Sequence, residues 1–298
     1  MRGREPVFIN PISDWGFHRL FGTPSNSRLL KYLLNTIIDD RNIVEVELRE
    51  PKHFYMTAEK GYSVFDVYCT CDDGSRIIVE MQKGNEGNFL DRAFAYSSMA
   101  VMDQAKQSWD YRLDKLYFIG ILNFDMFKGE NKYITRVMLS DIDKCGKIIY
   151  PNYLQIYIEL PKFVADDSEL NDARDALLFL LKNLGEMESV PEWVSGHDEE
   201  IQLICEGAQF KNLSENEKKE YIMSEDEQLR WERIVQHNRE EGRAEGLAEG
   251  HAEGLAEGLA EGESAKQKEI AFAMKAKGLS LELISELTGL SCEEIADL

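Results

Sequence analysis

The chain of 298 residues carries a net charge of −21, and 43% of its residues are hydrophobic and 10% aromatic. This length and composition predict one large domain, or one domain with appendages, with a sizeable core. No apolar run approaches the ~20 residues of a membrane span, and the N-terminus lacks the apolar region of a secretory signal. Five scattered cysteines fit reduced thiols, so we expect a cytoplasmic protein that does not bind membranes.

The charge is distributed unevenly along the chain. Residues 1–120 hold 15 basic and 17 acidic side chains, whereas residues 121–298 hold 19 basic and 38 acidic side chains. Nucleic-acid phosphates favour Lys and Arg, so the acidic second part argues against a DNA-binding surface there. The nearly neutral first part, residues 1–120, neither excludes nor supports a DNA-binding surface.

The first elements that the sequence predicts are a helical entry, a helix and a strand. Residues 11–22 place Asp14 beside aromatic side chains. Asp14 either caps a helix or lies on the surface, or it forms a third acidic group near the hairpin predicted for residues 63–83. Residues 26–38 have apolar residues at helical spacing, and residues 43–49 alternate as a strand does.

Residues 63–83 predict two strands joined by a tight turn. Asp66 lies in the apolar run of the first strand, and Glu80 and Gln82 occupy alternate positions of the second. The dipeptide Asp73-Gly74 between them is a strong hairpin signal. Because side chains alternate between the faces of a sheet, the register decides which of these polar groups meet.

Two registers are open for this hairpin. A two-residue loop would put Asp66 and Glu80 on opposite faces, whereas a loop of Asp72, Asp73 and Gly74, with Gly74 in the left-handed conformation, pairs Asp66 with Glu80. We favour the second register, which brings the two Cβ atoms to roughly 4.5–5.5 Å. Facing carboxylates repel each other unless one is protonated or a cation lies between them, and oxygen ligands suit Mg²⁺. The alternative is a surface hairpin with solvated charges.

The middle of the chain predicts a helix over residues 89–107 and a strand buried on both faces over residues 115–124. Arg92 and Tyr96 are one helical turn apart, and they either face a shared groove or serve in a salt bridge and in packing. A helix followed by a buried strand indicates an α/β sandwich. Further strands are expected at residues 133–142 and 154–160.

After Pro161 the pattern becomes helical, with amphipathic helices expected at residues 168–184 and 198–210. Residues 241–262 form a four-residue repeat rich in Ala, Glu, Gly and Leu. Each interior glycine costs a helix ~1 kcal/mol relative to alanine. We favour a weakly stable helical spacer that can self-associate, with a flexible linker as the alternative.

The last residues resemble a helix-turn-helix. Ser280 is placed to cap one helix, Thr288-Gly289 to form a turn, and Ser291 with Glu294 to form a capping box. The second helix offers acidic side chains where DNA-reading helices carry Arg, Lys, Asn or Gln. Helix packing or a protein partner is therefore favoured over DNA reading.

Several stretches spread over residues 10–240 together resemble the Rpn family of bacterial recombination-promoting nucleases, often labelled transposases, of the PD-(D/E)XK nuclease superfamily. These stretches are DWGFHRLFG, FDVYC, IVEMQ, DRAFAYSS and WDYRLDKLYFIGILNF. The resemblance implies an α/β fold with a restriction-endonuclease-like αβββαβ core and a C-terminal helical extension. It also implies Mg²⁺-dependent cleavage of DNA phosphodiester bonds.

The resemblance also assigns roles to individual residues. Asp66 is the hairpin aspartate, Glu80 is the first residue of the (D/E)XK element, and Asp14 is the acidic residue of the leading helix. Gln82 stands where the superfamily usually has lysine, so it can orient a water molecule but supplies no positive charge. The implied metal ligands are Asp66, Glu80 and the backbone carbonyl of Met81. Arg92 and Tyr96 are expected to hold the DNA backbone.

Four parts follow from this interpretation: a nuclease-like core over residues 1–165, a helical extension over 166–240, the repeat over 241–264, and the small tail over 265–298. We expect a metal-dependent DNA endonuclease linked to recombination or mobile elements, with DNA as partner and a homodimer as a possible assembly. The alternative is a catalytically weak, nuclease-derived DNA-binding or assembly protein. A true transposase would need an acidic triad on another fold.

Overall fold

The computed structural model describes residues 5–49, 65–85, 87–105, 112–144, 146–165, 170 and 172–298. The chain divides into two compact units, Met1–Asp226 and Glu227–Leu298, which we call the core unit and the tail unit. The boundary falls within the longest helix, α6 (Glu215–Ala276). The four-part division expected from the sequence stays a prediction.

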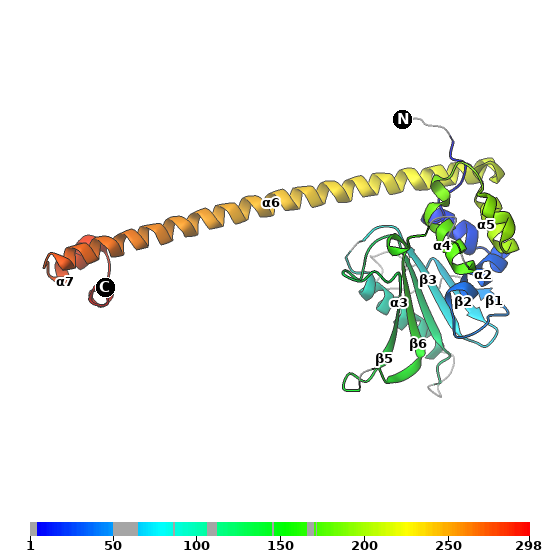
Figure 1. Cartoon of the computed structure of the whole chain (residues 1–298), viewed down its shortest axis with the longest axis horizontal. Helices are drawn as coiled ribbons and strands as arrows, with labels where there is room; N and C mark the ends of the chain where they lie inside the picture. Colours follow the sequence, from blue (N-terminus) through cyan, green and yellow to red (C-terminus); the bar gives the residue numbers. More distant parts are fainter. Residues whose placement is uncertain are drawn as a thin grey trace. The chain divides into compact units, whose positions relative to one another are not determined.

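A six-stranded mixed sheet forms the centre of the core unit, with the strand order β1-β2-β3-β4-β6-β5 (Figure 1). The first three strands pair antiparallel, β3, β4 and β6 run parallel, and β5 pairs antiparallel with β6. The strands are β1 (Val46–Leu48), β2 (Val67–Cys71), β3 (Arg76–Gln82), β4 (Leu116–Leu122), β5 (Ile134–Ser140) and β6 (Ile148–Glu159).

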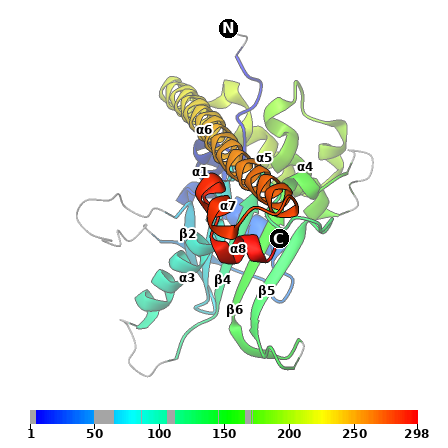
Figure 2. The same cartoon turned by 90° about the vertical axis from the view of Figure 1, so that its left-hand side faces the viewer.

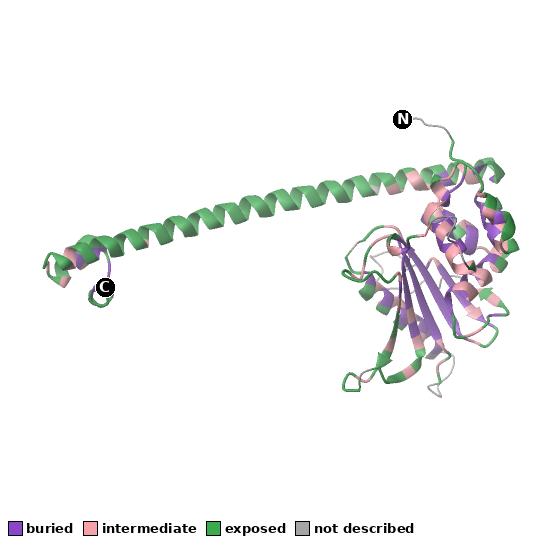
Figure 3. Ribbon diagram, viewed as in Figure 1, coloured by how far each residue is buried: buried purple, intermediate pink, exposed green. Residues whose placement is uncertain are grey.

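Helices cover both faces of this sheet. The helices of the core unit that precede α6 are α1 (Asp14–Phe21), α2 (Ser27–Ile37), α3 (Phe89–Ala105), α4 (Ala173–Asn183) and α5 (Glu199–Ala208). Apolar residues of α1, α2, α4 and α5 form one core with the sheet, and α3 forms a second core on the other face. Figure 3 shows the buried strands between these layers. The element order and layers confirm the predicted αβββαβ core.

Alternation along β3 assigns its side chains to the two cores. Ile77, Val79 and Met81 belong to the core under α1, α2, α4 and α5, whereas Ile78 faces α3. Glu80 therefore points to the α3 face, because side chains two positions apart share a face. Every residue of β4 is buried, which confirms the prediction of a strand buried on both faces.

The C-terminal half of α3 is joined to the start of β3 by a buried ion pair. A guanidinium nitrogen of Arg76 lies 3.5 Å from a carboxylate oxygen of Asp103, and both side chains are about 5% exposed. Arg76 also donates to the hydroxyl of Tyr68 at 3.3 Å. The ion pair joins α3 to the sheet, and the hydrogen bond joins β3 to β2.

Several predicted boundaries differ from the structure. The strand expected at 154–160 begins at Ile148, because its first half contains exposed positions and Pro151, which carry no strand signal. The strand expected at 43–49 spans only Val46–Leu48. Residues 63, 64, 106, 107, 168, 169 and 171 of the predicted elements lie outside the described residues.

The tail unit contains the rest of α6 together with α7 (Leu281–Thr288) and α8 (Cys292–Ala296). The repeat 241–262 is helical throughout, in agreement with the helix that the sequence favoured over a flexible linker. Ser280 caps α7, Gly289 ends it with φ +74°, and Ser291 with Glu294 forms the predicted capping box.

The two short helices pack against the C-terminal end of α6 (Figure 2). Their contact is a small apolar cluster made by Ala271, Ile284, Leu290 and Ile295. The helix-packing interpretation of the tail is thereby supported. No helix in the described ranges combines the length and the apolar character needed to cross a membrane.

Candidate active site

The hairpin of β2 and β3 has the three-residue loop and the register that the sequence favoured. Val67 pairs with Val79, so the same register carried one position further places Asp66 opposite Glu80. The N–H of Cys71 donates to the carbonyl of Ser75 at 2.9 Å, and Gly74 has φ +85°. The prediction that Asp66 and Glu80 are cross-strand neighbours is confirmed.

Both carboxylates are directed by backbone N–H groups. The N–H of Met81 donates to Oδ2 of Asp66 at 2.6 Å, and the N–H of Asp66 donates to Oε1 of Glu80 at 3.3 Å. Glu80 is only 4% exposed and Asp66 is half-buried. The hairpin therefore holds two acidic side chains next to each other in a site shielded from water.

Burial and mutual repulsion make ionisation of this pair unfavourable. Burial raises the pKa of Asp66 to about 7, with the nearby Asp14 adding to the effect. Burial, and then the charge of Asp66, raise the pKa of Glu80 well above its usual range. The N–H of Met81 and the charge of Arg92 oppose the shift at Asp66, and Arg92 opposes it at Glu80. A cation near the pair favours the charged form of both carboxyls.

Asp14 lies in the neighbourhood of the pair but does not cap α1. Ser13 is the cap, with its hydroxyl accepting the N–H of Gly16 at 3.2 Å, and Asp14 is the exposed first residue of the helix. Its charge raises the pKa of both Asp66 and Glu80. Within the described part of the chain, however, no three acidic, histidine or cysteine side chains converge closely enough to hold a metal ion.

Gln82 is hydrogen-bonded through both ends of its amide. Its Oε1 accepts an N–H from the guanidinium of Arg92, and its Nε2 donates to the carbonyl of Gly84 at 2.9 Å. Arg92 comes from the first turn of α3, which the chain reaches shortly after β3. The strand and the helix are thus joined by a second polar contact, at the end of β3 near the two carboxylates.

An aromatic ring supports the arginine. The guanidinium carbon of Arg92 lies 5.1 Å from the centre of the Phe89 ring. A side chain at Gly120 would bring its Cβ within 2.9 Å of that ring, so the glycine leaves space for Phe89 to pack on β4. Phe89 and Gly120 are site-supporting residues that the sequence reasoning missed, although the one-turn spacing of Phe89 and Arg92 could have indicated the first.

Tyr96 lies on the same helix, and its described contact is with a neighbour of Asp66. Its ring meets the ring of Phe65 edge-to-face, with centroids 5.1 Å apart and planes at 86°. This contact favours the packing alternative weighed for Tyr96. The contact also secures the segment that leads into Asp66.

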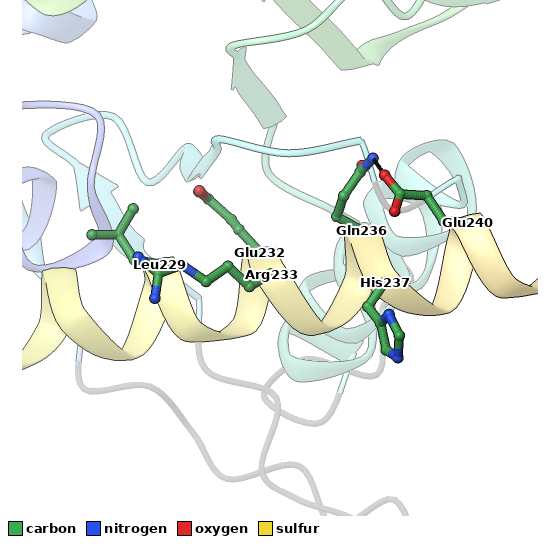
Figure 4. Close-up of a pocket in the computed structure, with 6 residues that line it drawn as sticks. All are labelled: Leu229, Glu232, Arg233, Gln236, His237 and Glu240. Carbon is green, nitrogen blue, oxygen red and sulfur yellow. Dashed lines mark hydrogen bonds between the residues drawn. The ribbon is translucent and has the colours of Figure 1, made fainter.

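A separate hollow of about 430 Å³ lies on α6 in the tail unit (Figure 4). Its lining comes entirely from consecutive turns of one helix. The residues are Leu229, Glu232, Arg233, Gln236, His237 and Glu240. Gln236 hydrogen-bonds Glu240 along the helix, as Figure 4 shows. These are ordinary surface contacts of an exposed helix. The hollow therefore gives no indication of a site like the two facing carboxyls of the hairpin.

Comparison with known proteins identifies the family. A family model described as PD-(D/E)XK nuclease family transposase matches residues 11–238. The chain belongs to this family. The match includes the hairpin and α3, and it confirms the resemblance to PD-(D/E)XK nucleases. The family links the chain to nucleases and mobile elements. Searches of curated proteins and of solved structures gave no match.

Proposed function

We propose that the chain is a metal-dependent DNA endonuclease that hydrolyses phosphodiester bonds. The observation that carries this proposal is the cross-strand pairing of Asp66 and Glu80 on one buried face. Two acidic groups held together in this way are costly to ionise unless a cation accompanies them. Because the chain belongs to a nuclease family, the reaction that we propose for this pair is phosphodiester hydrolysis.

The donor set fits a divalent cation such as Mg²⁺. The carboxylates of Asp66 and Glu80 and the backbone carbonyl of Met81 would hold it, and all three are the oxygen donors that Mg²⁺ prefers. One oxygen of each carboxylate accepts a backbone N–H, which fixes its orientation. When bound, the ion lowers the pKa of a coordinated water and neutralises charge on the phosphate.

Residues around the pair would complete the site. Asp14, exposed at the start of α1, would add negative charge for the cation or for a second one. Arg92, on the α3 face, would contact the DNA backbone, whereas the ring contact of Tyr96 with Phe65 supports a packing role for Tyr96. The link to recombination and the homodimer expected from the sequence remain proposals that are independent of this geometry.

A catalytically weak DNA-binding or assembly protein is the second candidate. The observation that favours it is Gln82, whose neutral amide stands where the family resemblance predicts a positively charged lysine. A neutral amide contributes less to stabilising a developing phosphoryl charge than an ammonium does. The net charge of −21 also weakens non-specific attraction of the chain to DNA.

Plasmid nicking separates the two candidates. Supercoiled DNA is incubated with the parent protein and with Asp66→Asn and Glu80→Gln, with Mg²⁺ and with EDTA. Glu47→Gln, at an exposed position of β1, is the matched acid-to-amide control. We expect Mg²⁺-dependent nicking by the parent and the control, and a loss of about 100-fold or more in each site variant.

Metal-dependent nicking that survives both site substitutions would falsify the proposed site. DNA binding by the parent without any nicking, in Mg²⁺ or Mn²⁺, would favour the second candidate. DNA binding is followed by fluorescence anisotropy in Ca²⁺.

A further inference from the structure

We propose that the loop between β4 and β5, residues 123–133, binds the DNA backbone beside the candidate active site, and that the buried Glu159 is the positioning residue that holds this loop. We call this segment the β4–β5 loop. The inference rests on the proposed nuclease function and adds a binding surface for its substrate. The sequence reasoning gave no role to the loop or to Glu159.

The β4–β5 loop begins at the edge of the sheet where the candidate site lies. β3, β4 and β6 run parallel, so their carboxyl ends meet at this edge, and ligands of open α/β sheets bind outside the carboxyl ends of the strands. The N–H of Asn123 donates to the carbonyl of Gln82 at 2.9 Å. The ring of Phe124 meets the ring of Phe89 edge-to-face, with centroids 6.3 Å apart. The loop is therefore attached both to β3 and to α3.

Glu159 lies on the sheet face that also carries the candidate site. The strand register pairs Gln82 with Leu122, and Leu122 with Glu159. Leu122 and Tyr157 belong to the core under α3, and side chains two positions apart share a face, so Glu159 points to the α3 face as well. Two strand spacings separate Glu159 from Gln82 by roughly 10 Å.

The carboxylate of Glu159 binds the backbone of the loop. Its Oε1 accepts the N–H of Met126 at 2.7 Å and the N–H of Phe127 at 3.0 Å. Nζ of Lys162 lies 2.8 Å from the same oxygen and donates to the carbonyl of Phe127 at 2.6 Å. The N–H of Glu159 donates to the carbonyl of Tyr133 at 2.8 Å. Glu159 thus holds the middle and the end of the loop.

Stability alone does not account for this buried ion pair. The side chain of Glu159 is 0% exposed and that of Lys162 is 8% exposed, and replacing such pairs by apolar residues is often neutral or stabilising. Within the described part of the chain, Oε2 of Glu159 has no hydrogen-bond partner, which adds a further cost. The pair therefore serves to fix one conformation of the loop rather than to strengthen the fold.

The held loop presents an exposed tip, residues 128–132, with a lysine at each end. Lys128 and Lys132 flank the acidic Glu130, and Gly129 turns the backbone with φ +86°. Two lysines and one glutamate give the tip a charge of only +1, so it would bind individual phosphates rather than attract DNA from a distance. Lysine contacts to phosphates position a duplex without reading its sequence.

A matched pair of double variants tests the tip. Lys128→Gln/Lys132→Gln removes its two lysines. The control, Lys144→Gln/Lys147→Gln, removes two exposed lysines from the loop between β5 and β6, which lies at the opposite end of the sheet (Figure 1). Both variants change the net charge equally, so a difference between them reports position. Fluorescence anisotropy with a short duplex in Ca²⁺ measures DNA affinity over a range of salt concentrations.

We expect the tip variant to bind duplex DNA about 5–10-fold more weakly, and its slope of log affinity against log salt to fall by about 1–2, because each phosphate contact adds about 0.9 to that slope. The control should keep the slope of the parent and stay within about twofold of its affinity. A tip variant that binds as the parent does, or that loses no more affinity than the control, would overturn the assignment.

Two further variants test the positioning role of Glu159. Glu159→Gln/Lys162→Met removes both buried charges but keeps an oxygen that can accept the two N–H groups of the loop. Glu159→Leu/Lys162→Met removes that acceptor as well. Hydrogen exchange follows the amides of Met126 and Phe127, and thermal melting shows which variants are folded.

We expect the Glu159→Gln variant to keep slow exchange at both amides and the DNA affinity of the parent. The Glu159→Leu variant should exchange these amides at least about tenfold faster, because it loses two hydrogen bonds, and should bind DNA as weakly as the tip variant. A folded Glu159→Leu variant with fast exchange and parental DNA affinity would overturn the positioning role. A parent that binds DNA without cutting it would contradict the proposed nuclease function, while the two lysine variants still decide whether the loop binds DNA.

Discussion

Two arginine contacts join α3 to β3, and they differ in the charge of the partner. At the start of β3, Arg76 meets the carboxylate of Asp103, and the pair is buried. At the end of β3, Arg92 meets the neutral amide of Gln82. The first contact balances its charge internally and serves packing. The second joins a charged side chain to a neutral amide near Asp66 and Glu80, so the two contacts along one strand–helix interface differ in their electrostatics.

The largest expected difference between the two contacts lies in how much each contributes to the free energy of unfolding. We predict that Arg76→Gln lowers the free energy of unfolding by about 3 kcal/mol, because Asp103 would remain buried without this opposite charge. Arg92→Gln should cost less than about 1 kcal/mol, since its hydrogen-bond partner Gln82 is a neutral amide and the substitution leaves no charge buried at that residue. Urea unfolding at pH 7 in EDTA measures both. Equal losses would show that the charge of the partner does not decide how much each contact stabilises the fold.

The pH dependence of stability tests the two buried carboxyls that lie near the second contact. The pKa of Asp66 is raised to about 7, above its unfolded value of about 3.9. Its stability contribution is therefore complete below about pH 4 and is lost as the pH rises through about 7. We predict that the unfolding free energy of the metal-free protein falls by about 2 kcal/mol between pH 5 and pH 8.

The double variant Asp66→Asn/Glu80→Gln provides the reference for that measurement. It has no ionisable carboxyl at either position, so its unfolding free energy in EDTA should be much flatter over the same range. Urea titrations at each pH unit measure the difference. A parent and a double variant with the same pH dependence would mean that the fold does not raise the pKa values of these two carboxyls.

The turn that sets the register should have a moderate effect. Gly74→Ala places a side chain at φ +85° and brings its Cβ to 3.3 Å from the carboxylate of Asp114. We predict a loss of about 1–2 kcal/mol in stability. A fall in the melting temperature with intact nicking of the folded fraction is the expected result. An unchanged melting temperature would show that the turn does not need a left-handed glycine.

The smallest effect is expected far from both contacts. Gly250 lies within α6, and a Cβ there would meet no atom within 4 Å. Gly250→Ala should stabilise the helix locally by up to about 1 kcal/mol and leave nicking unchanged. Hydrogen exchange of the α6 amides measures the first effect. Slower nicking would show that the repeat takes part in the reaction.

The sequence predicted the parts of the site that depend on local rules. Alternation along two strands and a glycine at the third loop position were sufficient to pair Asp66 with Glu80, because turn geometry fixes the register of a hairpin. Helix periodicity found α3, and an unbroken apolar run found β4. In contrast, β6 begins at Ile148, where exposed residues and Pro151 hide the strand.

Contacts across the fold could not be predicted in the same way. The sequence placed Gln82 and Arg92 on a strand and on a helix but did not show that their side chains meet. Asp14 approaches the hairpin only because α1 packs on the sheet, and its cap role was excluded by Ser13. Such contacts depend on how layers pack, and neither residue spacing nor composition records this.

Anomalous X-ray diffraction from crystals of the protein soaked in Mn²⁺ tests the central claim most directly. We predict a peak in contact with carboxylate oxygens of Asp66 and Glu80 and with the carbonyl of Met81, with Arg92 still bonded to Gln82. Soaked crystals of Glu80→Gln should lose this peak. A protein that nicks DNA in Mn²⁺ but shows no peak between these two carboxylates would contradict the account.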